Sequence, residues 1–338
     1  MATTYEHISQ NKWRTALLVL LFPISLTIIA WITLYLLFVV FKVGGDPVIY
    51  SEMALEAGMT AEQVLTQNLT NYLISVLPFV WLVAVGWLFI SWYVGAPLVL
   101  YGTGAMPVSR QTHREIYLMV ENLCITRGLP IPKIYIMEDS SLNAFATGRD
   151  PEHAIIALTS GIIEKLDRAE LEGVIAHELS HVENRDIRLM LLTVAGISFF
   201  TILGEISLRM ARSSSRGKNS KDNSALPLFF LGIGIALTIY GYIVAPLIRL
   251  AVSRTREYQA DATAALMTRN PAALASALRK ISADPRVEAL DKRESMAAMC
   301  IENPLAKEGF FSALAGLLAT HPPIEKRIAA LMEMDGRI

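Results

Sequence analysis

GVIAHELSHVENRD, residues 173–186, is the stretch of this sequence that decides its fold. It places His177 and His181 four positions apart, with Glu178 directly after the first. Residues four apart on an α-helix lie on one face, so both imidazoles can point at the same ion. Glu178 then flanks the ion instead of binding it, which suits a general base that activates water. The pattern predicts zinc-dependent hydrolysis, because zinc lowers the pKa of water and polarises a peptide carbonyl.

A catalytic zinc needs a third protein ligand and keeps one position open. The best candidate lies in SRTREYQAD, residues 253–261, where Glu257 and Asp261 are again four apart on one helix face. Glu257 can complete the site, and Asp261 can accept a hydrogen bond from the other nitrogen of a ligand histidine and fix its tautomer. Taken alone, this stretch is better explained as a solvated charged helix face. The histidine pair reverses that preference.

Near the C-terminus, THPPIEKR, residues 320–327, combines a histidine and an arginine. His321 precedes two prolines, which fix an extended segment, and Arg327 follows in a helical pattern. If both side chains face the zinc, they can stabilise the oxyanion of a tetrahedral intermediate. A loop histidine and a helix-surface arginine explain this stretch equally well.

The composition predicts an integral membrane protein. Apolar residues make up 53% of the 338 residues and charged residues 18%. The net charge of -1 offers no clustered basic surface for nucleic acid. Two cysteines without a CxxC pair exclude a thiolate metal site and a disulfide framework.

Four long apolar segments account for this composition, at residues 16–41, 72–94, 189–208 and 225–250. The first is long enough to span a hydrocarbon core with some tilt, and without a small-residue cleavage site it predicts an anchor. The second contains Pro78, which membrane helices tolerate. The third contains Glu205, so a buried helix of a soluble domain remains the alternative for it.

Charges beside these segments predict the orientation. Basic residues precede the first segment and follow the second, at Lys12, Arg14, Arg110 and Arg114. The loop between them, residues 42–71, holds one lysine against four acidic residues. By the positive-inside rule, the N-terminus and the chain after residue 101 start in the cytoplasm, and loop 42–71 lies outside.

The second pair of segments is ambiguous. His181 and Glu257 must meet at one ion, so the chain between them crosses the bilayer twice or not at all. A double crossing places the basic loop 209–224 outside, contrary to the positive-inside rule. We prefer a hairpin that crosses the bilayer, with the orientation set by the first pair of segments overriding the charges of loop 209–224. A non-spanning hairpin packed against protein is the alternative. Only about 12 Å of helix separates His181 from the third segment, so the ion lies close to the cytoplasmic membrane face.

Between the apolar segments, the sequence predicts a small α+β domain. Residues 131–139, 143–148 and 153–161 have strand patterns. Asp167 and Glu170 form a capping box, so a helix that begins near Arg168 runs through the histidines. Further helices are predicted at 254–268 and from Pro271. Residues 110–127 predict an amphipathic helix whose apolar side carries Ile116, Leu118, Leu123 and Ile125.

Together these features resemble the HtpX family of membrane-bound zinc metallopeptidases and, more distantly, the CAAX-processing zinc proteases of the same clan. The resemblance extends over nearly the whole chain: two N-terminal spans, NAFATG at 143–148, HELSHVENRD, two more hydrophobic segments, SRTREYQAD, and THPP followed by Arg327. Loop 42–71 is longer than the short turn typical of the family.

The resemblance implies a role for each candidate residue. His177, His181 and Glu257 correspond to the ligands of one zinc ion per chain, Glu178 to the catalytic base, and Asp261 to the acid behind a ligand. His321 and Arg327 match positions near the scissile carbonyl. The family's edge strand, on which extended substrate lies, corresponds to Asn143, Ala144, Phe145 and Ala146, and such pairing recognises the peptide backbone.

The expected fold is α+β, an integral membrane protein with about four transmembrane helices and a cytoplasmic gluzincin-type zinc metallopeptidase domain. Residues 1–105 form an N-terminal hairpin with the extracytoplasmic loop 42–71. Residues 106–188 supply the first part of the peptidase domain, with the edge strand and the histidine helix. A second hydrophobic hairpin covers 189–250, and 251–338 is the second part, with the third ligand.

The expected function is endopeptidase cleavage of misfolded or damaged membrane proteins at the cytoplasmic face of the inner membrane, in quality control and the stress response. The partners are such substrates and the lipid bilayer, and the resemblance implies cooperation with a membrane ATP-dependent protease. One alternative is a processing peptidase with a single membrane substrate. A less favoured one is a non-catalytic membrane scaffold or transporter in which the histidines are structural.

Overall fold

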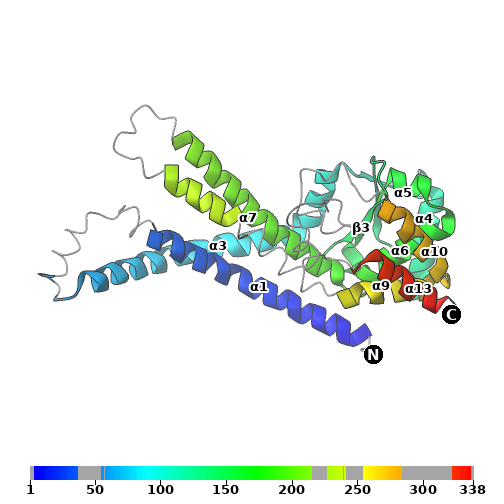
Figure 1. Cartoon of the computed structure of the whole chain (residues 1–338), viewed down its shortest axis with the longest axis horizontal. Helices are drawn as coiled ribbons and strands as arrows, with labels where there is room; N and C mark the ends of the chain where they lie inside the picture. The colour runs from blue at the N-terminus through cyan, green and yellow to red at the C-terminus, as the bar shows by residue number, and fades with distance from the viewer. Residues whose placement is uncertain are drawn as a thin grey trace. The chain divides into compact units, whose positions relative to one another are not determined.

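The structure is a computed structural model that describes residues 4–36, 55–56, 58–214, 227–238, 240, 254–283 and 322–335 (Figure 1). The chain forms two compact units. Unit 1 consists of Met1–Thr15, Ile90–Ala195 and Val244–Ile338, and unit 2 of Ala16–Phe89 and Gly196–Ile243. The four-part division expected from the sequence stays a prediction.

Three of the described helices are long and apolar enough to cross a membrane: α1 (Thr4–Tyr35), α3 (Ala61–Thr103) and α7 (Asp186–Ser214). Helix α1 covers residues 16–35 of the first apolar segment expected from the sequence, whose residues 37–41 lie outside the described residues, and α3 and α7 include the second and third segments. A shorter apolar helix, Pro227–Thr238, covers part of the fourth. Except for residue 240, the remainder of that segment, residues 225–226 and 239–250, lies outside the described residues.

Helix α3 begins eleven residues before the expected segment at 72, within the predicted loop 42–71. A capping box explains the early start. The Thr60 hydroxyl accepts a hydrogen bond from the backbone N–H of Gln63 at 3.2 Å, and the Gln63 side chain accepts one from the N–H of Thr60 at 2.8 Å. The helix therefore begins in polar sequence and only later becomes apolar.

Aromatic rings and small residues pack unit 2. Phe22 of α1 meets Phe199 of α7 edge to face, with ring centroids 5.3 Å apart. Gly204 of α7 lies so close to Pro227–Thr238 that an added Cβ would come within 2.7 Å of the Thr238 hydroxyl. Such small residues let membrane helices approach closely, where side-chain packing and not water drives association.

Unit 1 contains a four-stranded mixed sheet in the order β1-β2-β4-β3. The strands are β1 (Met106–Pro107), β2 (Lys133–Met137), β3 (Ala144–Thr147) and β4 (Ile155–Thr159). Strands β2 and β4 are parallel, and β1 and β3 join antiparallel at the two edges. The three expected strands are present, and the short β1 is an addition.

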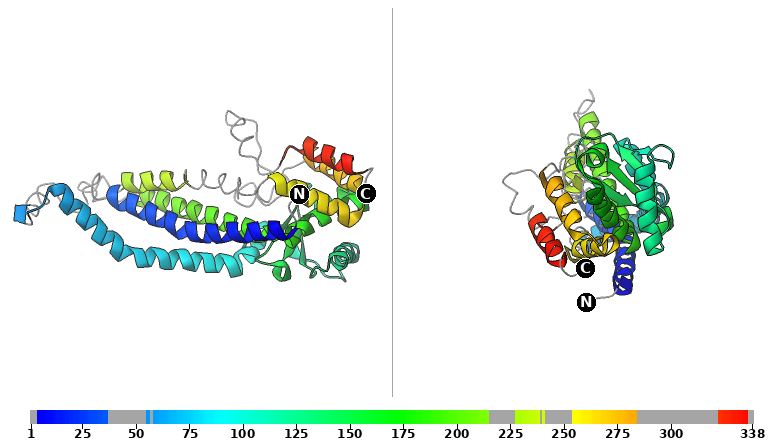
Figure 2. Two further views of the ribbon diagram at one scale, coloured as in Figure 1. Left: turned by 90° about the horizontal axis from the view of Figure 1, so that it is seen from below. Right: turned by 90° about the vertical axis from the view of Figure 1, so that its right-hand side faces the viewer.

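Among the described residues, the helices that lie wholly within unit 1 are α4 (Arg114–Arg127), α5 (Ser160–Lys165), α6 (Arg168–Glu183), α9 (Arg254–Thr268), α10 (Pro271–Ala283) and α13 (Ile324–Met334), and Pro151–His153 forms a 3-10 turn. In two views α9, α10 and α13, drawn in yellow, orange and red, lie together beside the sheet region (Figure 2). They share one core with α4, α6 and the sheet. This core positions the histidine helix.

Helix α4 corrects part of the expected apolar face. Ile125 is 71% exposed, so its assignment was wrong, and Leu118 is only half-buried. The buried side consists of Ile116, Met119, Val120, Leu123 and Cys124. These positions follow the 3.6-residue period, whereas the step from 116 to 118 crosses the helix.

Helix α6 begins at the expected capping box. The Asp167 carboxylate accepts hydrogen bonds from the N–H groups of Ala169 and Glu170, and the Glu170 carboxylate accepts one from the N–H of Asp167, all at 2.9 Å. The helix is buried on nearly every side, including at Gly173, where a Cβ would come within 3.2 Å of Leu274 on α10. Close packing against α9 and α10 therefore holds its histidines rigidly.

Candidate metal centre

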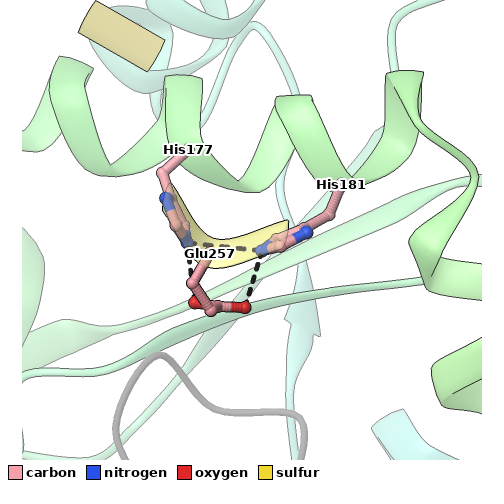
Figure 3. Close-up of side chains that lie close together, drawn as sticks. All are labelled: His177, His181 and Glu257. Carbon is pink, nitrogen blue, oxygen red and sulfur yellow. Dashed lines mark hydrogen bonds and ion pairs between the residues drawn. The ribbon is translucent and has the colours of Figure 1, made fainter. Parts of the chain in front are cut away.

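Helices α6 and α9 bring three of the predicted ligands together (Figure 3). The Nε2 atoms of His177 and His181 lie 3.3 Å apart. One carboxylate oxygen of Glu257 lies 3.8 Å from the first Nε2, and the other lies 3.8 Å from the second. All three residues are buried. Three potential ligand atoms from two helices thus converge on one point.

Carboxylates behind the histidines determine which ring nitrogens face that point. Nδ1 of His177 lies 3.0 Å from Asp261 Oδ1, and Nδ1 of His181 lies 3.0 Å from Asp186 Oδ2. An ionised carboxylate can only accept, so each Nδ1 carries the proton and donates it. With Nδ1 as the donor, Nε2 of each ring points towards the other ring and Glu257 and can bind a metal ion there. This arrangement suits a cation between the three side chains.

The spacing fits a tetrahedral metal ion. Bonds of about 2.1 Å in tetrahedral geometry place the ligand atoms about 3.4 Å apart. The observed separations of 3.3, 3.8 and 3.8 Å come within a few tenths of an ångström of that value. Two imidazoles and one carboxylate leave a fourth position for water or substrate, as catalytic metal sites do.

The site attracts positive charge. Burial lowers the pKa of His181, but the hydrogen bond to Asp186 and the charges of Glu257 and Glu178 outweigh it and raise that pKa from 6.5 to about 9. The same negative surroundings that favour a proton on the ring favour a metal ion in its place. The electrostatics of this pocket therefore suit a bound cation.

Glu178 lies beside the three ligand residues without belonging to their cluster. It follows His177 on α6 and is 3% exposed. Its charge acts on His181 and on Arg327, so its carboxylate lies near both. Glu178 therefore lies close to the point on which the three potential ligand residues converge.

Arg327 of α13 is fully buried behind the site. Its Nε donates to Asp261 Oδ2 at 2.8 Å, one terminal nitrogen donates to Oδ1 at 2.7 Å, and the other lies 3.6 Å from Glu257. Burial raises the pKa of Asp261, but the charge and hydrogen bonds of Arg327 and His177 lower it below its usual value. Asp261 thus stays ionised and holds the His177 ring.

Two further predicted features have different outcomes. His321 lies outside the described residues, so its predicted role stays a prediction. Strand β3 forms one edge of the sheet and packs beside α6. Its residues and the preceding Asn143 are buried, with Phe145 opposite Ala157 of β4. Pairing with substrate at this edge would therefore involve the backbone and not these side chains.

Asp186 is the site residue that the sequence reading missed. It follows His181 by five residues, within the opening motif, and is the first residue of α7. Arg185 adopts the left-handed conformation, with a φ of 60°, so the chain turns sharply between α6 and α7. This turn directs the Asp186 carboxylate back to the ring of His181. The sequence offered one signal for this role of Asp186, namely an acidic residue close to the histidine pair and just before an apolar segment.

Comparisons with known proteins agree with this geometry. The profile of Peptidase family M48 matches residues 110–335. A "Protease HtpX homolog" of Bacteroides fragilis (strain YCH46) is 42% identical over 327 residues, or 96% of each chain. Another, of Tropheryma whipplei (strain TW08/27), is 43% identical over 261 residues, which cover 77% of this chain and 86% of that protein.

Among solved structures, the crystal structure of S. mikatae Ste24p resembles this chain with a TM-score of 0.43 at 19% identity, over 89% of this chain and 66% of that one. The family profile covers strands β2, β3 and β4, both helices of the metal cluster and α13. The relatives extend the match to the apolar helices. The chain therefore belongs to peptidase family M48 and, within it, to the HtpX metalloproteases of membranes.

Proposed function

We propose that this protein is a zinc endopeptidase that cuts misfolded or damaged membrane proteins at the cytoplasmic face of the inner membrane. The observation that carries the proposal is the convergence of His177, His181 and Glu257 on one point, with Glu178 beside them. Residues 106–188 and 251–338 would form the peptidase domain around this point. The metalloprotease activity belongs to the family, and the substrate class and membrane face are the proposed part.

In this proposal His177, His181 and Glu257 hold zinc, which would supply a Lewis acid that polarises the peptide carbonyl and makes water nucleophilic near neutral pH. The donor set fits, because two imidazoles and one carboxylate are the ligands of known catalytic zinc sites. The carboxylates behind the two rings accept from Nδ1 and so orient the Nε2 atoms towards the zinc position.

The protein's own residues would move the protons. The Glu178 carboxylate takes a proton from the attacking water and then delivers it to the amide nitrogen as the peptide bond breaks. Such general acid–base catalysis typically contributes about 10²- to 10⁴-fold to the rate. Arg327 and His321 were predicted to stabilise the oxyanion, and the hydrogen bonds from Arg327 to Asp261 give the arginine a positioning role as well.

Several features support membrane substrates. His181 precedes the apolar helix α7 by only five residues, so the cluster lies near the end of a membrane-spanning candidate. Edge strand β3 offers backbone pairing, which needs little sequence preference and suits the removal of many different damaged proteins. The cytoplasmic orientation rests on the basic residues that precede the apolar part of α1 and on those that follow α3. Cooperation with a membrane ATP-dependent protease belongs to the same proposal.

The proposal can be tested with the full chain in proteoliposomes. The protein is purified with a chelator present and then supplied with zinc, together with a stable membrane protein or a destabilised variant of it. We expect zinc-dependent cleavage of the destabilised protein and of casein by the wild type, and none by Glu178→Gln. Equal inactivity of both enzymes would refute the protease mechanism. Cleavage of a single native substrate alone would favour a processing peptidase.

A further inference from the structure

The carboxylate that orients His181 is itself held by two residues from distant parts of the chain. Asp186 uses Oδ2 for the histidine. Its Oδ1 accepts a hydrogen bond from Arg256 of α9 at 2.9 Å and another from the side-chain amide of Asn11 of α1 at 2.6 Å. All four residues are buried and belong to unit 1. The N-terminal helix thus reaches the residue directly behind a ligand.

The side-chain amide of Asn11 uses both its nitrogen and its oxygen in hydrogen bonds. Its nitrogen donates to Asp186 and, at 3.0 Å, to the backbone carbonyl of Asn184 in the turn between α6 and α7. Its oxygen accepts from Arg256 at 3.1 Å. The two donated bonds and the accepted bond agree on one orientation of the amide group. Asn11 therefore holds both the carboxylate and the turn that carries it.

Arg256 links this cluster to the opposite side of the metal centre. It directly precedes Glu257, so the helix that supplies the third ligand also pairs with the acid behind the second. The pair of Arg256 and Asp186 is buried, with side-chain exposures of 6% and 2%. A buried charge pair requires its remaining donors and acceptors to be satisfied, and the Asn11 amide bonds both partners.

We propose that Asn11 and Arg256 are positioning residues of the metal centre, which hold Asp186 in the orientation that directs Nε2 of His181 at the metal. The inference rests on the proposed metal site and extends it to the N-terminal helix. Asn11 and Asp186 are also the first residues of two candidate membrane spans. Their hydrogen bond ties the beginnings of these two spans to the metal ligand.

The rate at which zinc leaves the protein tests this role. Zinc-loaded full-length protein in detergent is mixed with a chromophoric chelator, and zinc transfer is followed by absorbance. Loss of a residue behind a ligand typically weakens metal affinity about 10- to 100-fold. We expect zinc to leave Asn11→Ala about tenfold faster than the wild type. This value is near the lower end of that range because Asn11 acts on the ligand only through Asp186. Lys12→Ala, an exposed neighbour on the same helix, should match the wild type.

A double-mutant cycle shows whether Asn11 acts through Asp186. Residues that act through one another have non-additive effects, whereas independent effects add. Asp186→Asn should accelerate zinc loss by itself, and adding Asn11→Ala to it should then change the rate by less than about twofold. A tenfold effect of Asn11→Ala in both backgrounds would overturn the proposal, because it would show a general structural role.

Asn11→Asp provides a variant of the same shape if Asn11→Ala does not fold. It keeps the side-chain volume but replaces the amide donor with a second carboxylate beside Asp186, so we expect zinc loss at least as fast as for Asn11→Ala. Cobalt(II) substitution adds a spectroscopic readout: the visible ligand-field bands should shift in Asn11→Asp and not in Lys12→Ala. Unchanged bands and rates would overturn the inference. Wild-type protein that binds no zinc would instead refute the proposed metal site.

Discussion

Asp261 and Arg327 join α9 to α13 through two parallel hydrogen bonds of 2.8 and 2.7 Å, fully inside the protein. Oδ1 of the same carboxylate, which accepts one of these bonds, also lies 3.0 Å from Nδ1 of His177. The arginine therefore helps to hold the proposed metal ligand His177, although the two lie 150 residues apart in the sequence. A planar guanidinium suits this place because it matches both carboxylate oxygens at once.

Arg327→Lys should be a damaging substitution despite its retained charge. An ammonium group cannot form the paired hydrogen bonds, so Asp261 would lose part of its support and His177 would tilt. We expect zinc affinity to fall by about tenfold or more and the unfolding free energy by about 2–4 kcal/mol. Zinc titration and thermal unfolding measure the two effects. Lys326→Arg, at an exposed neighbouring position, is the control; equal effects of both variants would contradict the assignment.

The sequence predicted the metal cluster well because its signals are local. The spacing of His177 and His181 and the capping box at Asp167 define both the helix and the face that carries the ligands. The spacing of Glu257 and Asp261 does the same for α9. Each pattern needs only one helical turn, so the residues could be assigned before their partners in space were known.

The sequence could not predict contacts that depend on packing between distant segments. Asn11 and Asp186 are 175 residues apart, and no periodicity links them. The carboxylate of Asp186 reaches His181 only because Arg185 turns the chain with a positive φ, a conformation that arginine rarely adopts. The helical start at Thr60 was missed for a different reason, since its capping box precedes polar and not apolar sequence.

Glu170 makes the stability of the domain depend on pH. Burial raises the pKa of this carboxyl, but hydrogen bonds from Lys280, Ser276 and the N–H of Asp167, with the charge of Lys280, lower it below its unfolded value. The contribution of ionised Glu170 to the free energy of unfolding is therefore fully present above about pH 4.5 and is lost as the pH falls through the folded pKa. Because Lys280 is partly exposed, we expect this contribution to be about 1–2 kcal/mol.

Chemical unfolding of zinc-free wild type and Glu170→Gln between pH 3 and pH 7 measures this contribution. The difference between the two unfolding free energies should be constant near neutrality and shrink at acid pH. Glu164→Gln, an exposed carboxyl of the same unit, should show a smaller difference at every pH. A gap between wild type and Glu170→Gln that grows on acidification would contradict the assigned direction of the pKa.

Gly148 ends edge strand β3 in a conformation that other residues avoid. Its φ is 145°, and an added Cβ would lie 2.5 Å from the backbone carbonyl oxygen of His153. Gly148→Ala should therefore destabilise the protein by about 2 kcal/mol or more and disturb the strand. Gly128 also has a positive φ, of 65°, but open space around it. Gly128→Ala should cost about 1 kcal/mol in thermal unfolding, and equal effects would refute the clash.

The buried thiol of Cys124 should resist alkylation in the folded protein. Burial on the core-facing side of α4 raises the pKa of Cys124 to about 11, so little thiolate exists at pH 8. In a Cys300→Ser background, iodoacetamide should label Cys124 only after unfolding, as followed by mass spectrometry. Rapid labelling of the native protein would contradict the burial of this side of α4.

Two substitutions of the same type should separate metal binding from catalysis. Glu257→Gln removes the charge of a proposed ligand and leaves the fully buried Arg327 without one of its acidic neighbours, so zinc content should fall well below one ion per chain. Glu178→Gln changes no ligand, so zinc should remain while cleavage of casein falls by about 10²-fold or more, because the general base is lost. Metal analysis and cleavage assays on the same preparations measure both quantities. If Glu178→Gln also loses its zinc, this residue supports the metal and the proposed division between ligand and base is wrong.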